Sequence, residues 1–363
     1  KIIYVAPIVV DRFKGGIMRI GEMLSSEHSL TDFREEHINL ELFNSCILKQ
    51  KKESQGKFDF TNIKQAIFLL FYLSKRILKN NFDVVHFNSS AKFPLLKDQL
   101  ILFFITFLTS KKVYLQIHFS GIEETFLKLK LLRKFQFFLL RRLHKIILLS
   151  DNFRNELILT GIDEEKLTVL HNFHSVSDQE NSISLDSGSK LKLLFVGSIS
   201  ERKGFNDLLK AINNLKIDYD LNVLGEFSSE EIEVWSKTFI SINKLKVNFL
   251  GYLNGIKKDT IIKNSDVLIL PSYAEGFPMV IPEAMAFGCA IISTKIAGIP
   301  EIIEEGFNGY LINPGEIDEL SKRIEKLYFN RNILKEIKNN NLKLSTKYNR
   351  KGYIVKLSNI YKI

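Results

Sequence analysis

The sequence predicts an α/β protein with two domains, each built around a parallel β-sheet. Short apolar runs rich in Val, Ile, Leu and Phe recur along the chain and end in glycine or polar residues, as strands buried in parallel sheets do. Longer segments with helical character lie between them. With 363 residues, the chain is long for one domain and long enough for two with separate cores.

The expected strands occur in both halves of the chain. In the first half they are residues 1–7, 82–88, 112–119 and 144–150, and in the second half 191–198, 221–226, 247–253, 267–270 and 290–294. Helices are expected at 95–108, from about residue 205, and at 317–344. Residues 175–189 are rich in Ser, Asp and Asn, which is typical of a linker. We therefore expect domains at 1–172 and 191–345, joined by a linker at 173–190.

The composition is that of a soluble globular protein, with 45% apolar and 25% charged residues. Cys46 and Cys289 offer neither a disulfide framework nor a metal-binding spacing, so a reducing cytoplasmic location is expected. The first residues lack the form of a signal peptide. The longest apolar run, 100–108, is too short for a bilayer, which needs about 20 residues.

Positive charge gathers in the first half of the chain. The net charge is +10, and residues 1–170 hold 26 Lys and Arg against 18 Asp and Glu. No nucleic-acid-binding motif accompanies this charge, so no nucleic-acid partner is expected. Residues 125–145 combine seven basic residues with many apolar ones and no acid. Two interpretations of this segment stay open: an amphipathic helix on an anionic membrane surface, or a helix packed on the sheet with solvated lysines.

The stretch 271–288 reads as a strand end, a tight loop and a helix start in that order. Pro282 suits a first helical turn, and Gly288 can end the helix in a left-handed conformation. The loop can offer backbone N–H groups to a phosphate, from Gly276, Phe277, Met279 and Val280. Glu275 and Glu283, on either side, can accept hydrogen bonds from hydroxyls. Either glutamate alone could simply end a strand or complement a helix dipole, but the pair favours a sugar nucleotide as ligand.

Two further loops carry candidate binding residues. Arg202 and Lys203 follow the expected strand at 191–198 and can neutralise a diphosphate. Gly16 follows the first expected strand, where a glycine lets the backbone approach a ligand closely. His118 ends the strand-like run at 112–119, at the edge of a parallel sheet where ligands bind. Taken alone, each is also compatible with an ordinary turn, solvated loop charges or a histidine that caps a strand.

The segment E-G-F-P-M-V-I-P-E, residues 275–283, resembles the E-x7-E signature of retaining glycosyltransferases of family 4, which have the GT-B fold. This resemblance implies two Rossmann-like domains facing each other across a cleft, with a last helix at 346–363 that crosses back to the first domain. It also implies a hairpin at 306–312. In that family the residue matching Glu275 contacts the donor sugar and the residue matching Glu283 binds the ribose. His118 matches a histidine near the anomeric centre, and Gly16, Arg202 and Lys203 match the diphosphate site.

The resemblance implies a hexosyltransferase-type reaction that retains the anomeric configuration and needs no metal cofactor. Its donor would be a nucleotide-diphosphate sugar, with UDP the commonest nucleotide. The acceptor would be a saccharide, as in the assembly of O-antigen, capsule or lipopolysaccharide. A lipid-diphosphate-linked acceptor would explain the basic first half, with the protein peripheral on the inner face of the cell membrane. His118 and Glu275 are the expected catalytic residues. Two alternatives stay open: a sugar-nucleotide epimerase with the GT-B fold, and a non-catalytic partner subunit of a glycosyltransferase.

Overall fold

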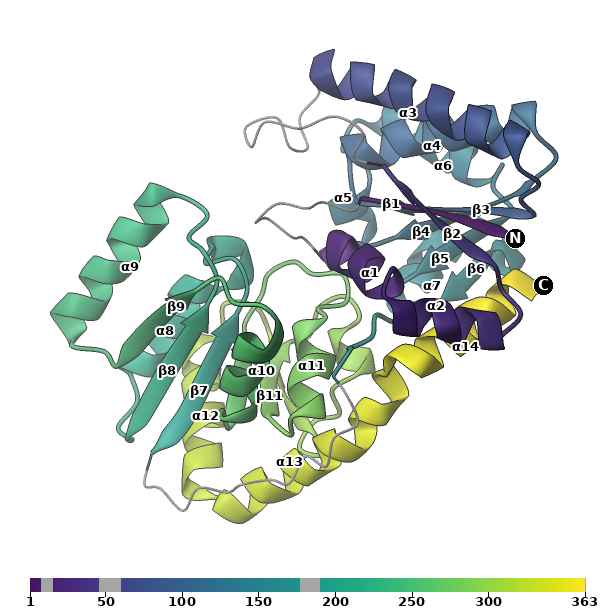
Figure 1. The fold of residues 1–363 in the computed structure, drawn as a ribbon. Coiled ribbons are helices and arrows are strands. Elements are labelled where there is room, and N and C mark those ends of the chain that lie inside the picture. Colours follow the sequence, from purple (N-terminus) through teal and green to yellow (C-terminus); the bar gives the residue numbers. More distant parts are fainter. Residues whose placement is uncertain (8–15, 46–59, 177–189, 363) are drawn as a thin grey trace. The chain divides into compact units, whose positions relative to one another are not determined.

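The computed structural model describes all residues except 8–15, 46–59, 177–189 and 363. The chain forms two compact units: unit 1 comprises Lys1–Asn172 with Arg350–Ile363, and unit 2 comprises Phe173–Asn349. Each unit is described by itself. Most of the expected linker lies outside the described residues. The last helix of the chain belongs to unit 1, although unit 2 precedes it in the sequence (Figure 1).

Unit 1 contains a six-stranded sheet in the order β2-β1-β3-β4-β5-β6, and every neighbouring pair is parallel. Its strands are β1 Ile2–Ala6, β2 Leu40–Asn44, β3 Val84–Ser89, β4 Lys112–Ile117, β5 Lys145–Leu148 and β6 Leu167–Val169. Its helices are α1 Gly16–Leu24, α2 Glu27–Glu35, α3 Phe60–Lys79, α4 Phe93–Leu108, α5 Ile122–Thr125, α6 Lys130–Leu140, α7 Asp151–Leu159, the 3-10 turn η2 Glu164–Lys166 and α14 Arg350–Lys362.

The two faces of the unit 1 sheet have different chemistry. On one face, apolar residues such as Val5, Phe87 and Leu115 form a core with α3, α4, α6 and α7. On the other face lie polar and aromatic side chains, among them His86, whose Nδ1 is 2.6 Å from the hydroxyl of Tyr361 on α14. Because successive residues of a strand point to opposite faces, this division follows directly from the alternation within β1, β3 and β4.

Unit 2 contains a second six-stranded parallel sheet, in the order β12-β11-β10-β7-β8-β9. Its strands are β7 Leu191–Val196, β8 Tyr219–Leu224, β9 Val247–Gly251, β10 Val267–Leu270, β11 Ala290–Thr294 and β12 Gly309–Ile312. Its helices are α8 Phe205–Asn213, α9 Glu230–Asn243, α10 Gly255–Lys263, α11 Val280–Ala286, α12 Ile317–Phe329 and α13 Arg331–Ser345, with the 3-10 turns η3 Glu201–Lys203, η4 Ile299–Glu301 and η5 Thr346–Tyr348.

Three local expectations are corrected by the structure. The hairpin expected at 306–312 is absent, because β12 pairs in parallel with β11 and Gly306 turns the chain before it. The helix expected at 317–344 is two helices, α12 and α13, which meet at Asn330. The basic segment at 125–145 contains a shorter helix, α6, and continues into β5. By contrast, β10 and β11 have the bounds that the sequence predicts.

Adjacent strands β7 and β10 of unit 2 form a topological switch point. The strand that follows β7 in sequence lies on one side of it, as β8, whereas β11 lies beyond β10 on the other side. The chain therefore leaves these two neighbouring strands in opposite directions, and α/β sheets commonly bind ligands at the carboxyl ends of such strands. In the described part of the chain, no helix combines the length and the apolar character needed to cross a bilayer.

Candidate active site

The loops after β7 and β10 meet at the switch point of unit 2. The loop after β7 contains η3, which carries Arg202 and Lys203, and the loop after β10 contains Glu275. A backbone hydrogen bond of 2.9 Å from Tyr273 N to Arg202 O joins the two loops. Two strands that are far apart in the sequence thus bring the cationic and the acidic candidates to one place.

Lys203 and Glu275 form an ion pair at this point. Both side chains are largely shielded, with 14% of Lys203 and 7% of Glu275 exposed. The Ser272 hydroxyl donates a second hydrogen bond of 2.8 Å to the same carboxylate oxygen, Oε1. An ammonium and a hydroxyl directed at one oxygen fix the carboxylate in place and leave the other oxygen, Oε2, able to accept hydrogen bonds.

Arg202 is held by the same loop but stays exposed to solvent. Its Nη1 donates a hydrogen bond of 2.7 Å to the carbonyl of Ala274, next to Glu275. A guanidinium has five N–H donors, so this bond leaves most of them able to bind an anion. The pair of cations predicted for a diphosphate is therefore present, one partly buried and one exposed.

Gly204 allows the two loops to approach each other closely. Its φ is +67°, a left-handed conformation that favours glycine, and a Cβ there would lie 2.0 Å from the carbonyl oxygen of Pro271. The carbonyl oxygen belongs to the backbone and cannot move away as a flexible side chain would. The glycine after Lys203 is therefore needed for the contact that brings Lys203 to Glu275.

The loop between Glu275 and α11 is packed into unit 2. Gly276, Phe277 and Met279 are buried and Val280 is half-buried. The Phe277 ring lies 5.9 Å from the ring of Tyr348 between centroids. Val280 begins α11, where a first N–H has no acceptor within the helix, but α11 has only 7 residues and its dipole is correspondingly weak. The side-chain cations are thus the stronger positive charges at this site.

Glu283 lies inside unit 2 with a lysine partner that the sequence did not suggest. Its Oε2 is 2.7 Å from Nζ of Lys258 on α10, and both side chains are almost fully buried. A buried carboxylate is tolerated only when it is paired, and the Lys258 ammonium supplies that partner inside the fold. Gly288 has a φ of 75° and ends α11 as expected.

In unit 1, His118 follows β4, and Gly16 is the first residue of α1. His118 Nε2 lies 2.8 Å from Oδ1 of Asn88, at the end of neighbouring β3. The same Oδ1 accepts a hydrogen bond of 2.9 Å from the hydroxyl of Tyr4, while the Asn88 amide nitrogen donates to the carbonyl of Val5 at 3.0 Å. Residues 8–15, immediately before Gly16, lie outside the described residues.

These contacts define the tautomer of His118. A backbone carbonyl can only accept, so Val5 requires the amide nitrogen of Asn88 on its side and leaves Oδ1 toward His118. Because Oδ1 also only accepts, His118 Nε2 must carry the hydrogen. Nδ1 then has the lone pair; it is buried and has no hydrogen-bond partner within the described part of the chain. Burial lowers the pKa of His118 to about 3, so the ring is neutral near pH 7.

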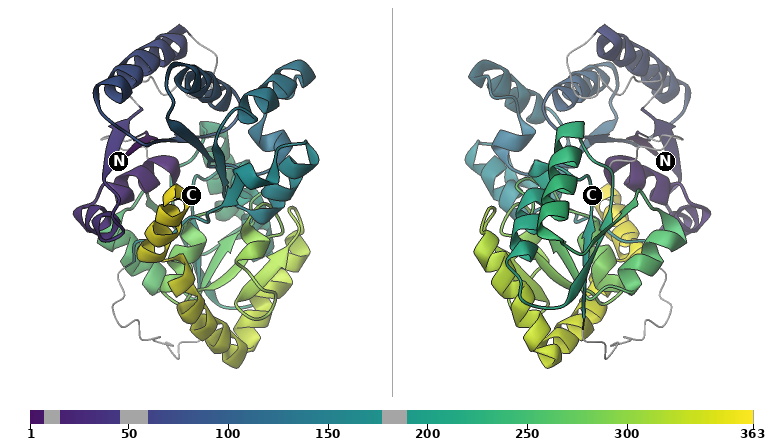
Figure 2. Two further views of the ribbon diagram at one scale, coloured as in Figure 1. Left: turned by 90° about the vertical axis from the view of Figure 1, so that its right-hand side faces the viewer. Right: turned by 90° about the vertical axis from the view of Figure 1, so that its left-hand side faces the viewer.

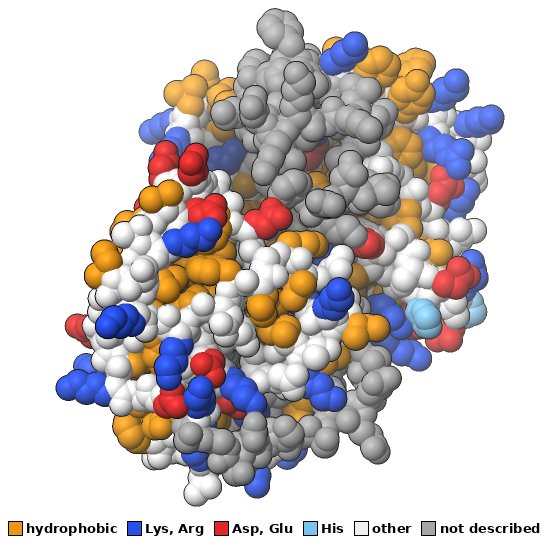
Figure 3. Space-filling view, turned by 60° about the vertical axis from the view of Figure 1, so that its left-hand side comes forward, with side chains coloured by type: hydrophobic (Ala, Val, Ile, Leu, Met, Phe, Trp, Pro, Cys, Tyr) orange, Lys and Arg blue, Asp and Glu red, His pale blue; other side chains and the backbone are white. Residues whose placement is uncertain are grey.

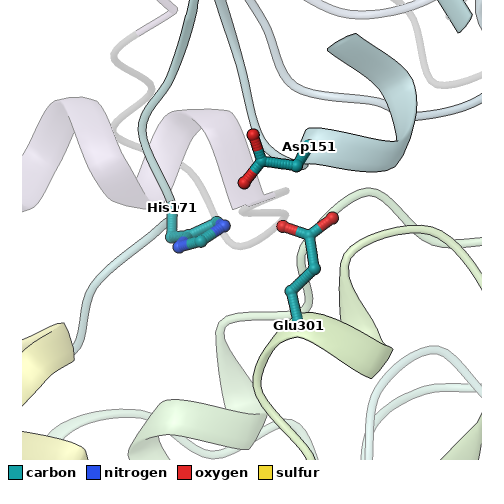
Figure 4. Close-up of side chains that lie close together, drawn as sticks. All are labelled: Asp151, His171 and Glu301. Atoms are coloured by element: carbon teal, nitrogen blue, oxygen red, sulfur yellow. The ribbon is translucent and has the colours of Figure 1, made fainter. Parts of the chain in front are cut away.

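Asp151 and His171 lie close together elsewhere in unit 1. Asp151 begins α7 and His171 follows β6, and a carboxylate oxygen of Asp151 lies within 4.8 Å of a ring nitrogen of His171. Figure 4 shows Glu301 of η4 with them. Glu301 belongs to unit 2, and the position of one unit relative to the other is not determined. No metal site therefore follows from these three residues.

Two family models match consecutive parts of the chain. The model described as "Glycosyl transferases group 1" matches residues 177–344, and the model described as "Glycosyltransferase Family 4" matches residues 48–177. The chain belongs to the glycosyltransferases that these two models describe. In the glycosyltransferase, the switch-point loops with Lys203 and Glu275 fall within the first match, and His118 falls within the second.

Curated relatives of the glycosyltransferase include proteins from two bacteria. An uncharacterized 41.2 kDa protein in the cps region of Klebsiella pneumoniae is 25% identical over 84% of this chain and 85% of that protein. The putative colanic acid biosynthesis glycosyltransferase WcaL of Salmonella typhimurium is 26% identical over 51% of this chain and 48% of its own length.

Solved structures share the fold over the whole chain. Alr3699/HepE of Anabaena, crystallised with UDP, has a TM-score of 0.75 at 18% identity and covers 100% of this chain and 99% of its own. The lipopolysaccharide outer core galactosyltransferase WaaB, in its apo form, has a TM-score of 0.75 at 19% identity, with coverages of 100% and 99%. The expected GT-B class, with two Rossmann-like units, is confirmed.

Two residues that shape these sites were missed in the sequence: Ser272 and Lys258, which hold the two glutamates. Asn88, which orients His118, follows an apolar run that ends in polar residues, and that pattern indicates a position at the sheet edge. Lys258 lies among several surface-type lysines of α10, and nothing in the sequence distinguishes it.

Proposed function

We propose that this glycosyltransferase moves a sugar from a nucleotide-diphosphate sugar to a saccharide acceptor and retains the anomeric configuration. The observation that carries the proposal is the Lys203–Glu275 ion pair at the switch point of unit 2, with Arg202 beside it. A diphosphate needs fixed positive charge, and a sugar needs oriented acceptors for its hydroxyls. This arrangement offers both within one pair of loops.

Lys203 and Arg202 would hold the donor diphosphate. The Lys203 ammonium has three donors, so it can contact Glu275 and a phosphate oxygen together. The exposed guanidinium of Arg202 can bind phosphate oxygens in a bidentate manner. When the bond from the anomeric carbon to the phosphate oxygen breaks, its electron pair leaves with the nucleotide diphosphate, and these cations stabilise the charge that develops there.

Glu275 and Glu283 would bind hydroxyls of the donor. Glu275 keeps Oε2 for the sugar, because Lys203 and Ser272 both occupy Oε1. Glu283, paired with Lys258, is assigned to the ribose as in the family. The amides of Gly276, Phe277, Met279 and Val280 would support the phosphates, as would the backbone at Gly16.

His118 would accept a hydrogen bond from a sugar hydroxyl near the reacting carbon. Its neutral ring presents a lone pair at Nδ1, which suits a hydroxyl donor. In the reaction, the acceptor oxygen bonds to the anomeric carbon from the face that the diphosphate leaves, and its proton passes to the departing phosphate oxygen. This path needs no carboxylate nucleophile and no metal ion, since the positive charges of Lys203 and Arg202 already oppose the diphosphate.

UDP is the proposed nucleotide, because the related Anabaena protein was crystallised with it. Polysaccharide assembly is the proposed role, because relatives are named for colanic acid biosynthesis and for a cps region. We further propose an acceptor carried on a lipid diphosphate, at the inner face of the cell membrane. The positive charge of the first 170 residues supports this part of the proposal.

Ligand-induced thermal stabilisation tests the donor site. A ligand that binds only the folded state raises the melting temperature, so we expect UDP-sugars to stabilise the protein more than GDP- or ADP-sugars do. Lys203→Gln should weaken UDP binding at least tenfold, because it removes a partly buried cation from the diphosphate. Lys237→Gln, on the exposed face of α9, is the matched control and should leave the shift unchanged.

Product analysis distinguishes the reactions. Transfer requires an acceptor, whereas an epimerase would convert the donor alone. The proposed transfer should also persist after EDTA treatment. Equal UDP affinity in Lys203→Gln and the wild type, or conversion of the donor sugar to its epimer without acceptor, would contradict the proposal.

A further inference from the structure

Helix α3 of unit 1 is apolar on two faces. One face, with Leu69, Leu73 and Ile77, is buried in the core of the unit. The other exposes Ile67, Phe71 and Leu78, with exposed fractions of 64%, 61% and 70%. Their spacing of four and seven residues places them on one stripe of the helix. A helix that covers a sheet needs only one such stripe, so the second requires another explanation.

Helices α4 and α6 expose similar stripes. On α4 these are Phe104, Phe107 and Leu108, with Phe107 exposed by 82%. On α6 they are Leu131, Phe135 and Phe138, with Leu131 exposed by 75%. Of the large apolar side chains exposed on the described part of unit 1, all but Leu129 and Leu159 lie on α3, α4 and α6.

The three helices form one layer. Helix α4 contacts both α3 and α6, and both views of Figure 2 show the three lying side by side on one side of the sheet. We call their outer surface the three-helix face. Its nine apolar side chains are the three already named on each helix. Clusters of exposed apolar side chains on neighbouring helices favour an interaction site.

The charges of the three-helix face are almost entirely positive. The sequences of α3, α4 and α6 contain eight Lys and Arg, and their one acidic residue, Asp98, is buried. Lys75, Lys79 and Lys134 are exposed among the apolar side chains. Along the upper edge of Figure 3, where α3 lies, hydrophobic and basic side chains alternate at the surface.

This chemistry favours an anionic lipid surface as the occupant. A second copy would bring the same positive charges face to face, which opposes association. Lysine is also depleted from protein interfaces, whereas it is favoured beside aromatic and aliphatic side chains at a membrane surface. Long lysine side chains can extend to headgroup phosphates while the phenylalanines enter the acyl boundary.

We propose that the three-helix face docks unit 1 on an anionic bilayer. This adds a surface to the proposed function but does not depend on it, because lipid binding requires no donor or acceptor. Helix α6 belongs to the basic segment at 125–145, for which a membrane contact and packing on the sheet were the two open interpretations. The proposal is compatible with both, because α6 buries Leu139 and Leu140 and exposes the stripe with Phe135.

Vesicle co-sedimentation tests this docking. The full chain is mixed with vesicles of phosphatidylcholine alone or with 30% phosphatidylglycerol, about the fraction that gives a clear negative surface. We expect binding to the anionic vesicles, weakening as salt is raised. The triple substitution Phe71→Gln, Phe107→Gln and Leu131→Gln should weaken it at least tenfold, and Lys75→Gln with Lys79→Gln and Lys134→Gln should do the same.

The matched control is Val234→Gln with Ile242→Gln, which removes exposed apolar side chains from α9 of unit 2. It should bind vesicles as the wild type does. Failure to bind anionic vesicles at low salt, or equal binding by the apolar triple variant, would overturn the proposal. The proposal would also be overturned if sedimentation velocity showed a dimer that the apolar triple variant abolishes. The three-helix face would then join two copies of the chain. UDP stabilisation should be unchanged in both triple variants. Absence of UDP stabilisation in the wild type would count against the proposed function and not against lipid docking.

Discussion

At the scale of single residues, the structure explains why the candidate site residues need particular partners. Glu275 has two donors on one oxygen, and His118 has an acceptor that specifies its tautomer. Ser272 and Asn88 carry no charge, so they orient the functional groups without changing the net charge of the site, whereas the other donor to Glu275 is the Lys203 ammonium. These contacts leave the lone pairs at Glu275 Oε2 and His118 Nδ1 for a ligand.

The contact between Asn88 and His118 predicts a shifted pH profile in Asn88→Asp. A carboxylate beside the ring favours imidazolium and raises the pKa of His118 from the low value that burial causes. Since protonated His118 cannot accept a hydrogen bond at Nδ1, the acid limb of kcat/KM for sugar transfer should move upward by at least one pH unit. Asn39→Asp, at an exposed position, should leave the limb in place. An unmoved limb in Asn88→Asp would show that the charge state of His118 is not used.

His86 predicts how stability depends on pH. Its side chain is buried against Tyr4, Tyr361 and the Gln116 side chain, and burial, then the charge of His118, lowers its pKa to about 3. The unfolded chain therefore binds a proton between about pH 6.5 and 3 that the folded chain does not, so stability is full above pH 6.5 and falls as pH decreases through this window.

The expected contribution of His86 to this loss is about 1 kcal/mol per pH unit below pH 6. Urea unfolding at pH 7 and pH 5 measures it. The midpoint should fall less with pH in His86→Gln than in the wild type, whereas His28→Gln, at an exposed position, should behave as the wild type does. The same fall in all three proteins would assign the pH dependence to other groups.

At the scale of elements, the close contact of two loops depends on one glycine. Gly204 and Gly251 have nearly equal positive φ values, +67° and +68°, but only Gly204 faces backbone, while nothing lies within 4 Å of a Cβ at Gly251. Comparing the two positions separates the cost of the left-handed conformation from the cost of the steric clash.

Gly204→Ala should destabilise unit 2 more than Gly251→Ala does. The left-handed backbone costs each variant roughly 1–2 kcal/mol, and the contact with Pro271 O adds about 1–3 kcal/mol in Gly204→Ala alone. The free energy of unfolding by urea gives the difference. We also expect Gly204→Ala to reduce UDP stabilisation, because the loop that carries Lys203 must shift. Equal destabilisation by both substitutions would contradict the close contact.

Elements also show where local patterns mislead. The apolar character of α3 would suggest burial, yet Ile67, Phe71 and Leu78 are exposed, because a helix on a sheet has only one inward face. The segment at 306–312 has the glycines of a hairpin, but β12 pairs in parallel with β11 and forms the edge strand of the sheet. Pairing direction depends on which strand is already in place, and a local pattern does not contain that information.

At the scale of the whole molecule, the two units carry different candidate residues, each on a parallel sheet of six strands. Unit 2 gathers Arg202, Lys203, Glu275 and Glu283 around β7, β10 and α11, and unit 1 holds His118 and exposes the three-helix face. The last helix, α14, returns to unit 1 and supplies Tyr353 and Tyr361 to the polar face of its sheet. The termini of the chain therefore belong to one unit, and truncating α14 would expose His86 and its neighbours to water.

The sequence by itself determined the α/β class, the strands β10 and β11, and the residue types of the candidate site in unit 2. Apolar runs, glycines and charges adjacent in the chain carry that information, because strand burial and loop chemistry are local properties. Only the tertiary structure decided which partners hold those residues. Lys203 and Glu275 are joined because β7 and β10 are neighbours, Lys258 of α10 pairs with Glu283 of α11, and Asn88 meets His118 across two strands. Such contacts link positions far apart in the chain, and their geometry is set only when the whole sheet has formed.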